Sequence, residues 1–161
     1  MRIVTRLSTA LVCAVALFAC NNKMENPLLT PSGNRFNAPA FDKIKTEHYL
    51  PALREGIAEG RREIEAIANN PEAPTFENTI LAIENAGSLL GNVSRVFDNL
   101  SKANTNDSIN ALDKEMAPIL TGHYDEISMN SKLFNRIKTV WDKKSSLGLD
   151  AEDLKLLEDT Y

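Results

Sequence analysis

The sequence predicts an all-α protein, an antiparallel helical bundle of about five helices. Apolar residues recur at steps of three and four along the chain after residue 40, which is the spacing of one helix face. No segment shows the apolar and polar alternation of a half-buried strand. With 161 residues, 43% of them hydrophobic and 25% charged, the chain suits one domain with a true core.

The first expected helix covers Tyr49–Ala68, with Pro51 in its first turn, where a missing amide hydrogen is tolerated. Asn69-Asn70-Pro71 ends it. The second helix is expected to begin after Thr75 as N-cap and to run unbroken to residue 101 or 102. The buried positions expected in these two helices are Leu50, Leu53, Ile57, Gly60, Ile64, Ile67, Ile80, Ile83, Gly87, Leu90, Val93, Phe97 and Leu100.

Three further helices are expected downstream. The third follows the polar loop 103–107, and Pro118 in its interior should bend it near Lys114 or Glu115. The fourth follows Asn130-Ser131, and the fifth begins after Asp150 as N-cap. Their expected buried positions are Ile109, Leu112, Met116, Ile119, His123, Ile127, Leu133, Ile137, Val140, Trp141, Leu154, Leu157 and Tyr161.

The N-terminus has the pattern of an export signal. Residues 1–6 carry two arginines and no acid, and the apolar run 11–19 is too short to remain as a membrane span. The run ends in Leu17-Phe18-Ala19-Cys20, which resembles the bacterial lipobox, in which the cysteine receives diacylglycerol after cleavage.

We therefore expect residues 1–19 to be a lipoprotein signal peptide and Cys20 to be the lipidation site. The protein would be exported and anchored to a bacterial membrane, on the periplasmic side or at the outer membrane. The alternative is an ordinary signal peptide cut after Ala19, which also exports the protein.

Residues 20–40 are expected to form a polar tether, because prolines and a glycine interrupt any periodicity there. The folded part is expected to cover residues 41–161. Cys13 lies in the expected signal peptide, so no disulfide should form in the mature chain.

The charge of the chain argues against nucleic acid as a partner. The formal net charge is −4, and removal of Arg2 and Arg6 with the signal peptide lowers it to −6. Phosphate binding needs a basic surface, which this composition does not provide.

No combination of residues in the chain forms a complete catalytic motif. Zinc hydrolysis on a helix needs two histidines one turn apart with a neighbouring glutamate, whereas His48 and His123 each stand alone. We therefore predict no catalytic and no metal-binding residue in this chain, and a structural role for both histidines. No serine stands in a nucleophile elbow, and no glycine-rich loop follows a strand.

Two other acidic or polar groupings could in principle form sites. The carboxylates of Glu63 with Glu65, and of Asp125 with Glu126, point apart on a helix and are predicted to be solvated. The loop 104–107 offers oxygens to calcium but lacks the full spacing with its terminal glutamate, so a helix-capping loop is the favoured interpretation.

Several stretches, in this order, resemble the N-terminal region of the thimet-oligopeptidase-like zinc peptidases, the family of oligopeptidase A and the peptidyl-dipeptidases. They are Phe41–Ala52, Asn70–Thr79, Ala82–Glu84, Phe97–Asn106 and Lys132–Ile137. The resemblance extends over nearly all of residues 41–161.

The resemblance implies a mostly helical enzyme that cleaves short peptides inside a deep channel with a zinc ion. The His-Glu-x-x-His motif and third glutamate ligand of the family lie far downstream and have no counterpart here. Residues 41–161 would then be an N-terminal region, truncated at its C-terminus, that walls the channel, binds no zinc and is inactive alone. Its partners would be short peptides, the missing C-terminal half and the membrane.

The turn at 74–79 has two interpretations within that resemblance: a structural one, with Thr75 capping and Phe76 packing, and a contact with the channel. For the whole chain, the alternative function is a stand-alone helical lipoprotein that binds a partner or ligand. The fifth helix, still in phase at Tyr161 without a closing residue, favours the fragment.

Overall fold

The computed structural model describes residues 25–161, and the expected signal peptide and Cys20 lie outside the described residues. The described part consists of helices joined by loops, so the all-α prediction is confirmed. Within residues 25–161, no helix has the length and apolar character needed to cross a membrane.

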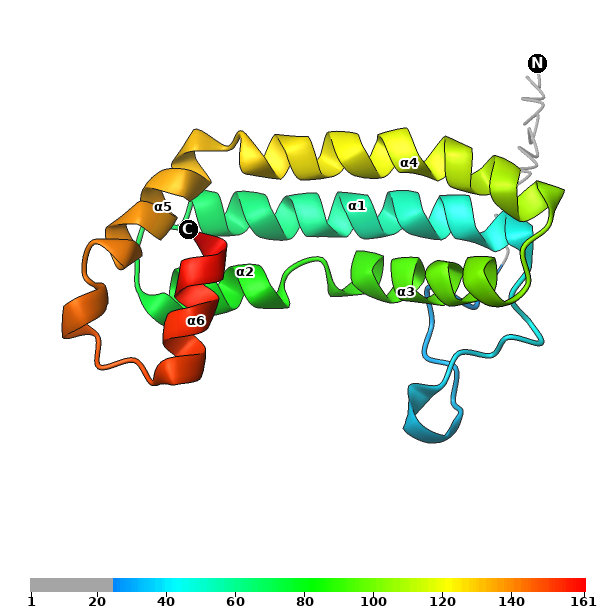
Figure 1. Ribbon diagram of the computed structural model, residues 1–161, viewed down its shortest axis with the longest axis horizontal. Helices are drawn as coiled ribbons and strands as arrows, with labels where there is room; N and C mark the ends of the chain where they lie inside the picture. Colours follow the sequence, from blue (N-terminus) through cyan, green and yellow to red (C-terminus); the bar gives the residue numbers. More distant parts are fainter. Residues whose placement is uncertain (1–24) are drawn as a thin grey trace, which may run out of the picture.

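Helix α1 (Thr46–Ala68) is the middle helix of the bundle. It lies between α3 (Ser88–Ala103) and α4 (Asp107–Ser128), and it packs mainly on these two helices (Figure 1). In Figure 1, α3 runs antiparallel to α1, and α4 returns in the direction of α1. The antiparallel arrangement therefore holds for α1 with α3 and for α3 with α4.

The predicted second helix is divided into three elements, so the prediction of one unbroken helix was wrong. A π-helical turn, η2 (Phe76–Leu81), leads into the short α2 (Ala82–Asn85), and α3 starts after Gly87. Gly87 has a φ of 70°, in the left-handed region that glycine adopts without steric cost. The carboxylate of Glu63 accepts a hydrogen bond from the Gly87 amide at 2.7 Å, which fixes the break from a distant part of the chain.

Polar side chains cap the starts of η2 and α6. The side chain of Thr75 accepts a hydrogen bond from the Asn78 amide, and that of Asp150 accepts from the amides of Glu152 and Asp153, so both predicted N-caps are confirmed. Helix α4 continues unbroken through Pro118. The other elements are α5 (Ser131–Trp141), α6 (Ala151–Thr160) and two 3-10 turns, η1 (Arg35–Asn37) and η3 (Lys144–Ser146).

Helix α6 buries less than its apolar pattern predicted. Leu157 is fully buried, whereas Leu154 and Tyr161 are 37% and 47% exposed, so their predicted inward positions were wrong. The helix packs mainly on η2 and α5, and a helix packed at the edge of a bundle buries a narrower stripe. Tyr161 instead stacks on Trp141, with 4.6 Å between the ring centroids.

Two separate hydrophobic cores lie along α1. The first core joins the N-terminal half of α1 to α3 and α4. The second core joins its C-terminal half to η2, α5 and α6. The buried members of the first core are Tyr49, Ala52, Leu53, Ile57, Leu90, Val93, Phe97, Ile109, Leu112 and Met116. Those of the second are Ile64, Ile67, Ala68, Phe76, Ile80, Leu133, Ile137, Val140 and Leu157.

Candidate functional site

The segment that precedes α1 is docked on the bundle by one buried carboxamide. The Nδ2 of Asn26 donates to the backbone oxygen of His48 at 2.8 Å, and its Oδ1 accepts from the Leu28 amide at 3.0 Å. Leu28 and Leu29 then pack against the first core. Packing on the helices therefore begins before Phe41, inside the stretch that was expected to be a polar tether.

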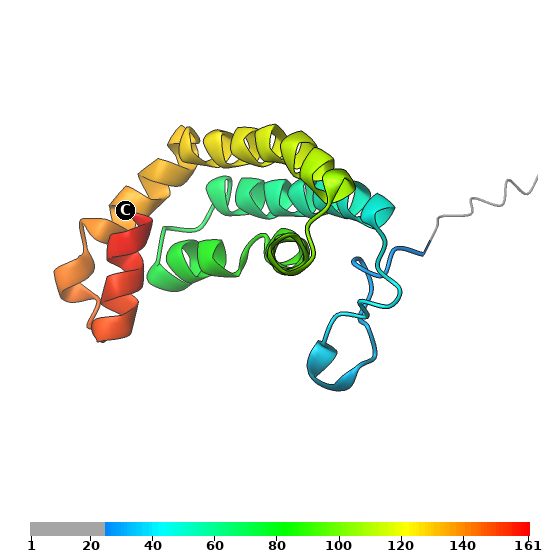
Figure 2. The ribbon, with the colours of Figure 1, turned by 45° about the vertical axis from the view of Figure 1, so that its right-hand side comes forward.

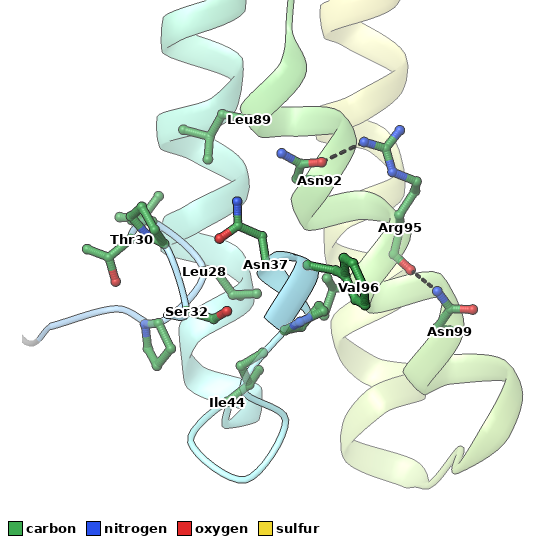
Figure 3. Close-up of a pocket in the computed structure, with 15 residues that line it drawn as sticks. Leu28, Thr30, Ser32, Asn37, Ile44, Leu89, Asn92, Arg95, Val96 and Asn99 are labelled. Carbon is green, nitrogen blue, oxygen red and sulfur yellow. Dashed lines mark hydrogen bonds between the residues drawn. The ribbon is translucent and has the colours of Figure 1, made fainter. Parts of the chain in front are cut away.

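This docking forms an open groove with a volume of about 700 Å³ between residues 27–44 and one face of α3, which we call the α3 groove. Figure 3 shows Leu28 on the N-terminal side and Asn92 and Arg95 on the side of α3. The lining from α3 consists of Leu89, Asn92, Arg95, Val96 and Asn99, and the lining from the opposite side includes Pro27, Leu28, Thr30, Ser32, Asn37 and Ile44. Apolar and carboxamide side chains thus share one surface.

Arg95 is the positively charged residue of the α3 groove. Its Nη2 donates to Oδ1 of Asn92 at 2.6 Å, and its backbone oxygen accepts from Nδ2 of Asn99 at 2.9 Å. Within residues 25–161, Arg95 forms no ion pair, whereas Arg54, Arg61 and Arg62 on α1 each lie near a glutamate. The guanidinium therefore remains available to an anion from outside these residues.

A second, smaller cavity of about 300 Å³ lies beside His123 on α4. His123 is 4% exposed and, within the part of the chain that the structure describes, its Nδ1 has no hydrogen-bond partner. Arg61 on α1 pairs with Glu126 of α4 at its rim, with 2.5 Å between Nη2 and Oε2. Burial lowers the pKa of His123, the charge of Arg61 lowers it further, and Glu126 opposes both effects.

The stability of the fold should therefore fall in mild acid through His123. Because the folded-state pKa lies below the usual value of 6.5, the neutral ring is favoured in the fold. This stabilisation is complete above about pH 6.5 and is lost as the pH falls towards the folded pKa. The free energy of unfolding is measured with urea at about pH 7.5 and about pH 5.5. The decrease between the two pH values should be smaller for His123→Gln than for the wild type. An equal loss in both would contradict this assignment.

The other histidine, His48, lies in a different part of the fold. Its Nδ1 accepts a hydrogen bond from the Lys45 amide at 3.1 Å at the start of α1, which agrees with the predicted structural role. Within residues 25–161, no three His, Cys, Asp or Glu side chains gather as metal ligands. These residues therefore do not fit a zinc ion of the kind that the resemblance implies.

The polar groups that the sequence singled out have structural partners. Glu65, Asp125 and Glu126 are exposed, as predicted, and Glu126 also pairs with Arg61. Glu63 is half-buried and accepts a hydrogen bond from the Gly87 amide, which the prediction of a solvated face did not include. Asn106 accepts hydrogen bonds from the amides of Ser108 and Ile109, which confirms the capping interpretation of loop 104–107.

Arg136 is the main structural residue that the sequence analysis missed. It is 7% exposed. Its Nη1 donates to the backbone oxygens of Asn70 and Glu72 at 2.9 and 3.0 Å, and its Nη2 donates to Asn78 and Thr79 at 2.9 and 3.3 Å. The stretches 70–79 and 132–137, both part of the family resemblance, therefore meet at this side chain. Its position within the apolar stripe of α5 was the available signal.

Comparison with known proteins finds sequence similarity between this helical unit and peptidases. No protein-family model matches the chain. A dipeptidyl carboxypeptidase of Salmonella typhimurium is 47% identical over 133 residues, and one of Escherichia coli is 44% identical over the same length. The chain is homologous to peptidases. Oligopeptidase A of Salmonella typhimurium is 24% identical over 119 residues, which cover 74% of this chain and 17% of that protein.

The similarity to the dipeptidyl carboxypeptidases covers 83% of this chain, which spans only about 20% of the length of these relatives. The resemblance to this group of peptidases is therefore confirmed for the helical unit. Zinc dependence, lipidation of Cys20 and export to a bacterial membrane stay predictions from the sequence.

Proposed function

We propose that the chain is part of a peptidase that hydrolyses short peptides, in which residues 25–161 wall the substrate channel and contribute no catalytic residue. One observation carries the proposal: 47% identity over 133 residues to a dipeptidyl carboxypeptidase, of which this segment spans 20%. Identity at this level over such a length requires the same arrangement of core residues, so the segment takes the corresponding structural place in its parent protein.

The shape of the unit supports the role of a wall. In Figures 1 and 2, α6 and residues 26–44 project to the same side of the layer formed by α1, α3 and α4. Such an arrangement can border a channel at both ends of the layer. A wall of this kind acts on the reaction by excluding folded proteins and bulk water from the site of hydrolysis.

The chemistry of hydrolysis is assigned to the rest of the parent protein. A zinc ion in such an enzyme would polarise the scissile carbonyl and activate water. Because His48 and His123 lie apart and no cluster of metal ligands forms within residues 25–161, the zinc ligands of the parent would come from outside this segment. No step through the metal is therefore assigned to the residues described here.

The first experiment is to sequence the genomic DNA beyond the codon for Tyr161. An open frame that encodes His-Glu-x-x-His several hundred residues downstream is expected. The purified product should then release C-terminal dipeptides from short peptides, and a zinc chelator should abolish this activity until zinc is restored.

Two outcomes would contradict the proposal. One is a stop codon directly after Tyr161, which would favour a stand-alone helical protein that binds a partner. The other is an open frame whose intact product hydrolyses no short peptide. Restoration of activity by magnesium as effectively as by zinc would contradict only the assignment of the metal.

A further inference from the structure

We propose that the α3 groove binds the C-terminal carboxylate end of a short peptide, with Arg95 as the anion-binding residue. The inference rests on the proposed function, because it names a contact between this wall and the peptides that the parent would cleave. It is carried by three features of the groove: a cation without an ion-pair partner within residues 25–161, carboxamides beside it, and apolar side chains from both sides of the groove.

Arg95 gives the α3 groove its positive charge. The chain has a net charge of −4, so it disfavours an anionic ligand as a whole. Arg95 is exposed, and of its several N–H groups only one donates to a side chain within residues 25–161, that of Asn92. A planar guanidinium with free donors binds a carboxylate in bidentate fashion, which a lysine would not do. The groove therefore complements a single carboxylate at this point.

The remaining lining suits the rest of a peptide. Asn92 and Asn99 flank Arg95 along α3, and a carboxamide can donate to and accept from a peptide group at the same time. Leu28, Leu89 and Val96 provide an apolar surface for one side chain of the ligand. A volume of about 700 Å³ lies within the usual size range of small-ligand sites.

The test measures binding and does not depend on hydrolysis. The full chain, kept in a mild detergent, is titrated into an apolar tetrapeptide with a fluorescent label at its N-terminus and a free C-terminus. Fluorescence anisotropy should show saturable binding. The same peptide with a C-terminal amide should bind about tenfold more weakly, because one charge-assisted contact is lost.

Variants then assign the contact to Arg95. Arg95→Gln should weaken binding of the free-acid peptide about tenfold and leave binding of the amide unchanged. Arg62→Gln, an exposed arginine on α1, is the matched control and should bind as the wild type does. Asn92→Asp keeps Arg95 but places a carboxylate on its guanidinium, and it should cause the same loss. Circular dichroism checks that each variant is folded.

The proposal is overturned if the acid and amide peptides bind equally, if Arg95→Gln binds as the wild type does, or if no saturable binding occurs. Acetate that displaces the peptide fully at equal concentration would show that any small carboxylate suffices, and it would also overturn the assignment to a peptide. Binding without hydrolysis by the parent would contradict the proposed function and leave this site standing. Hydrolysis by the parent without binding of the peptide to the α3 groove would contradict this site and leave the proposed function standing.

Discussion

Replacement of Gly56 by alanine should lower the free energy of unfolding by about 2 kcal/mol. A methyl group at this position would lie 2.8 Å from the Cα and 2.9 Å from the amide nitrogen of Leu90, closer than real contacts allow. Both atoms belong to the backbone of α3, so no side-chain rotation can relieve the clash. Helices α1 and α3 would have to move apart and loosen the first core. Chemical denaturation monitored by circular dichroism measures the effect.

Gly122→Ala is the matched control. Gly122 also lies inside a helix, α4, but a methyl group there would meet nothing within 4 Å. The substitution should therefore raise stability by up to about 1 kcal/mol, because alanine favours the helix over glycine. Effects of the same sign at both positions would show that the close approach of α1 and α3 does not determine the result.

Replacement of Arg136 by methionine should destabilise the fold by about 3 kcal/mol. The buried guanidinium donates to two backbone oxygens in the loop 70–72 and to the side chains of Asn78 and Thr79. Methionine fills similar space and leaves these acceptors without their donor, which costs more than the hydrogen bonds themselves contributed. The connection between α1 and η2 should lose its fixed conformation, and its backbone amides should exchange faster with solvent.

Lys132→Met on the same helix provides the comparison. The Nζ of Lys132 donates to Asn69 at 2.7 Å, but this contact is exposed, so the change should stay within about 0.5 kcal/mol. A loss at Arg136 no greater than that at Lys132 would show that solvent replaces the buried hydrogen bonds without cost.

Local patterns allowed the prediction of the helices. Helix α1 was expected over residues 49–68 and is found at Thr46–Ala68, because its apolar stripe and its Asn-Asn-Pro terminator are both local signals. The caps at Thr75 and Asp150 depend on side chains within a few residues of the helix start. Features of this kind can be inferred from the sequence alone.

The features that were missed depend on contacts between distant residues. The break at Gly87 is stabilised by Glu63, and the N-terminal segment is held by the bond from Asn26 to His48. Neither pairing leaves a periodic pattern, so a continuous helix and a free tether were the simpler expectations. The α3 groove shares this origin, because it exists only when residues 27–44 lie against α3.

The two cores along α1 have a consequence for folding. Among the residues that the structure describes, α1 is the only helix with buried members in both cores, and α4 reaches the second core only through the partly buried Ile127. It contains 23 residues and is therefore roughly 35 Å long. Each core can form only if its half of α1 is helical. Once one half is helical, the helix extends readily into the other half, because propagation of a helix costs far less than nucleation. Helix α1 thus transmits folding cooperativity between two regions that otherwise share few contacts, so the unit should unfold as one body rather than as two.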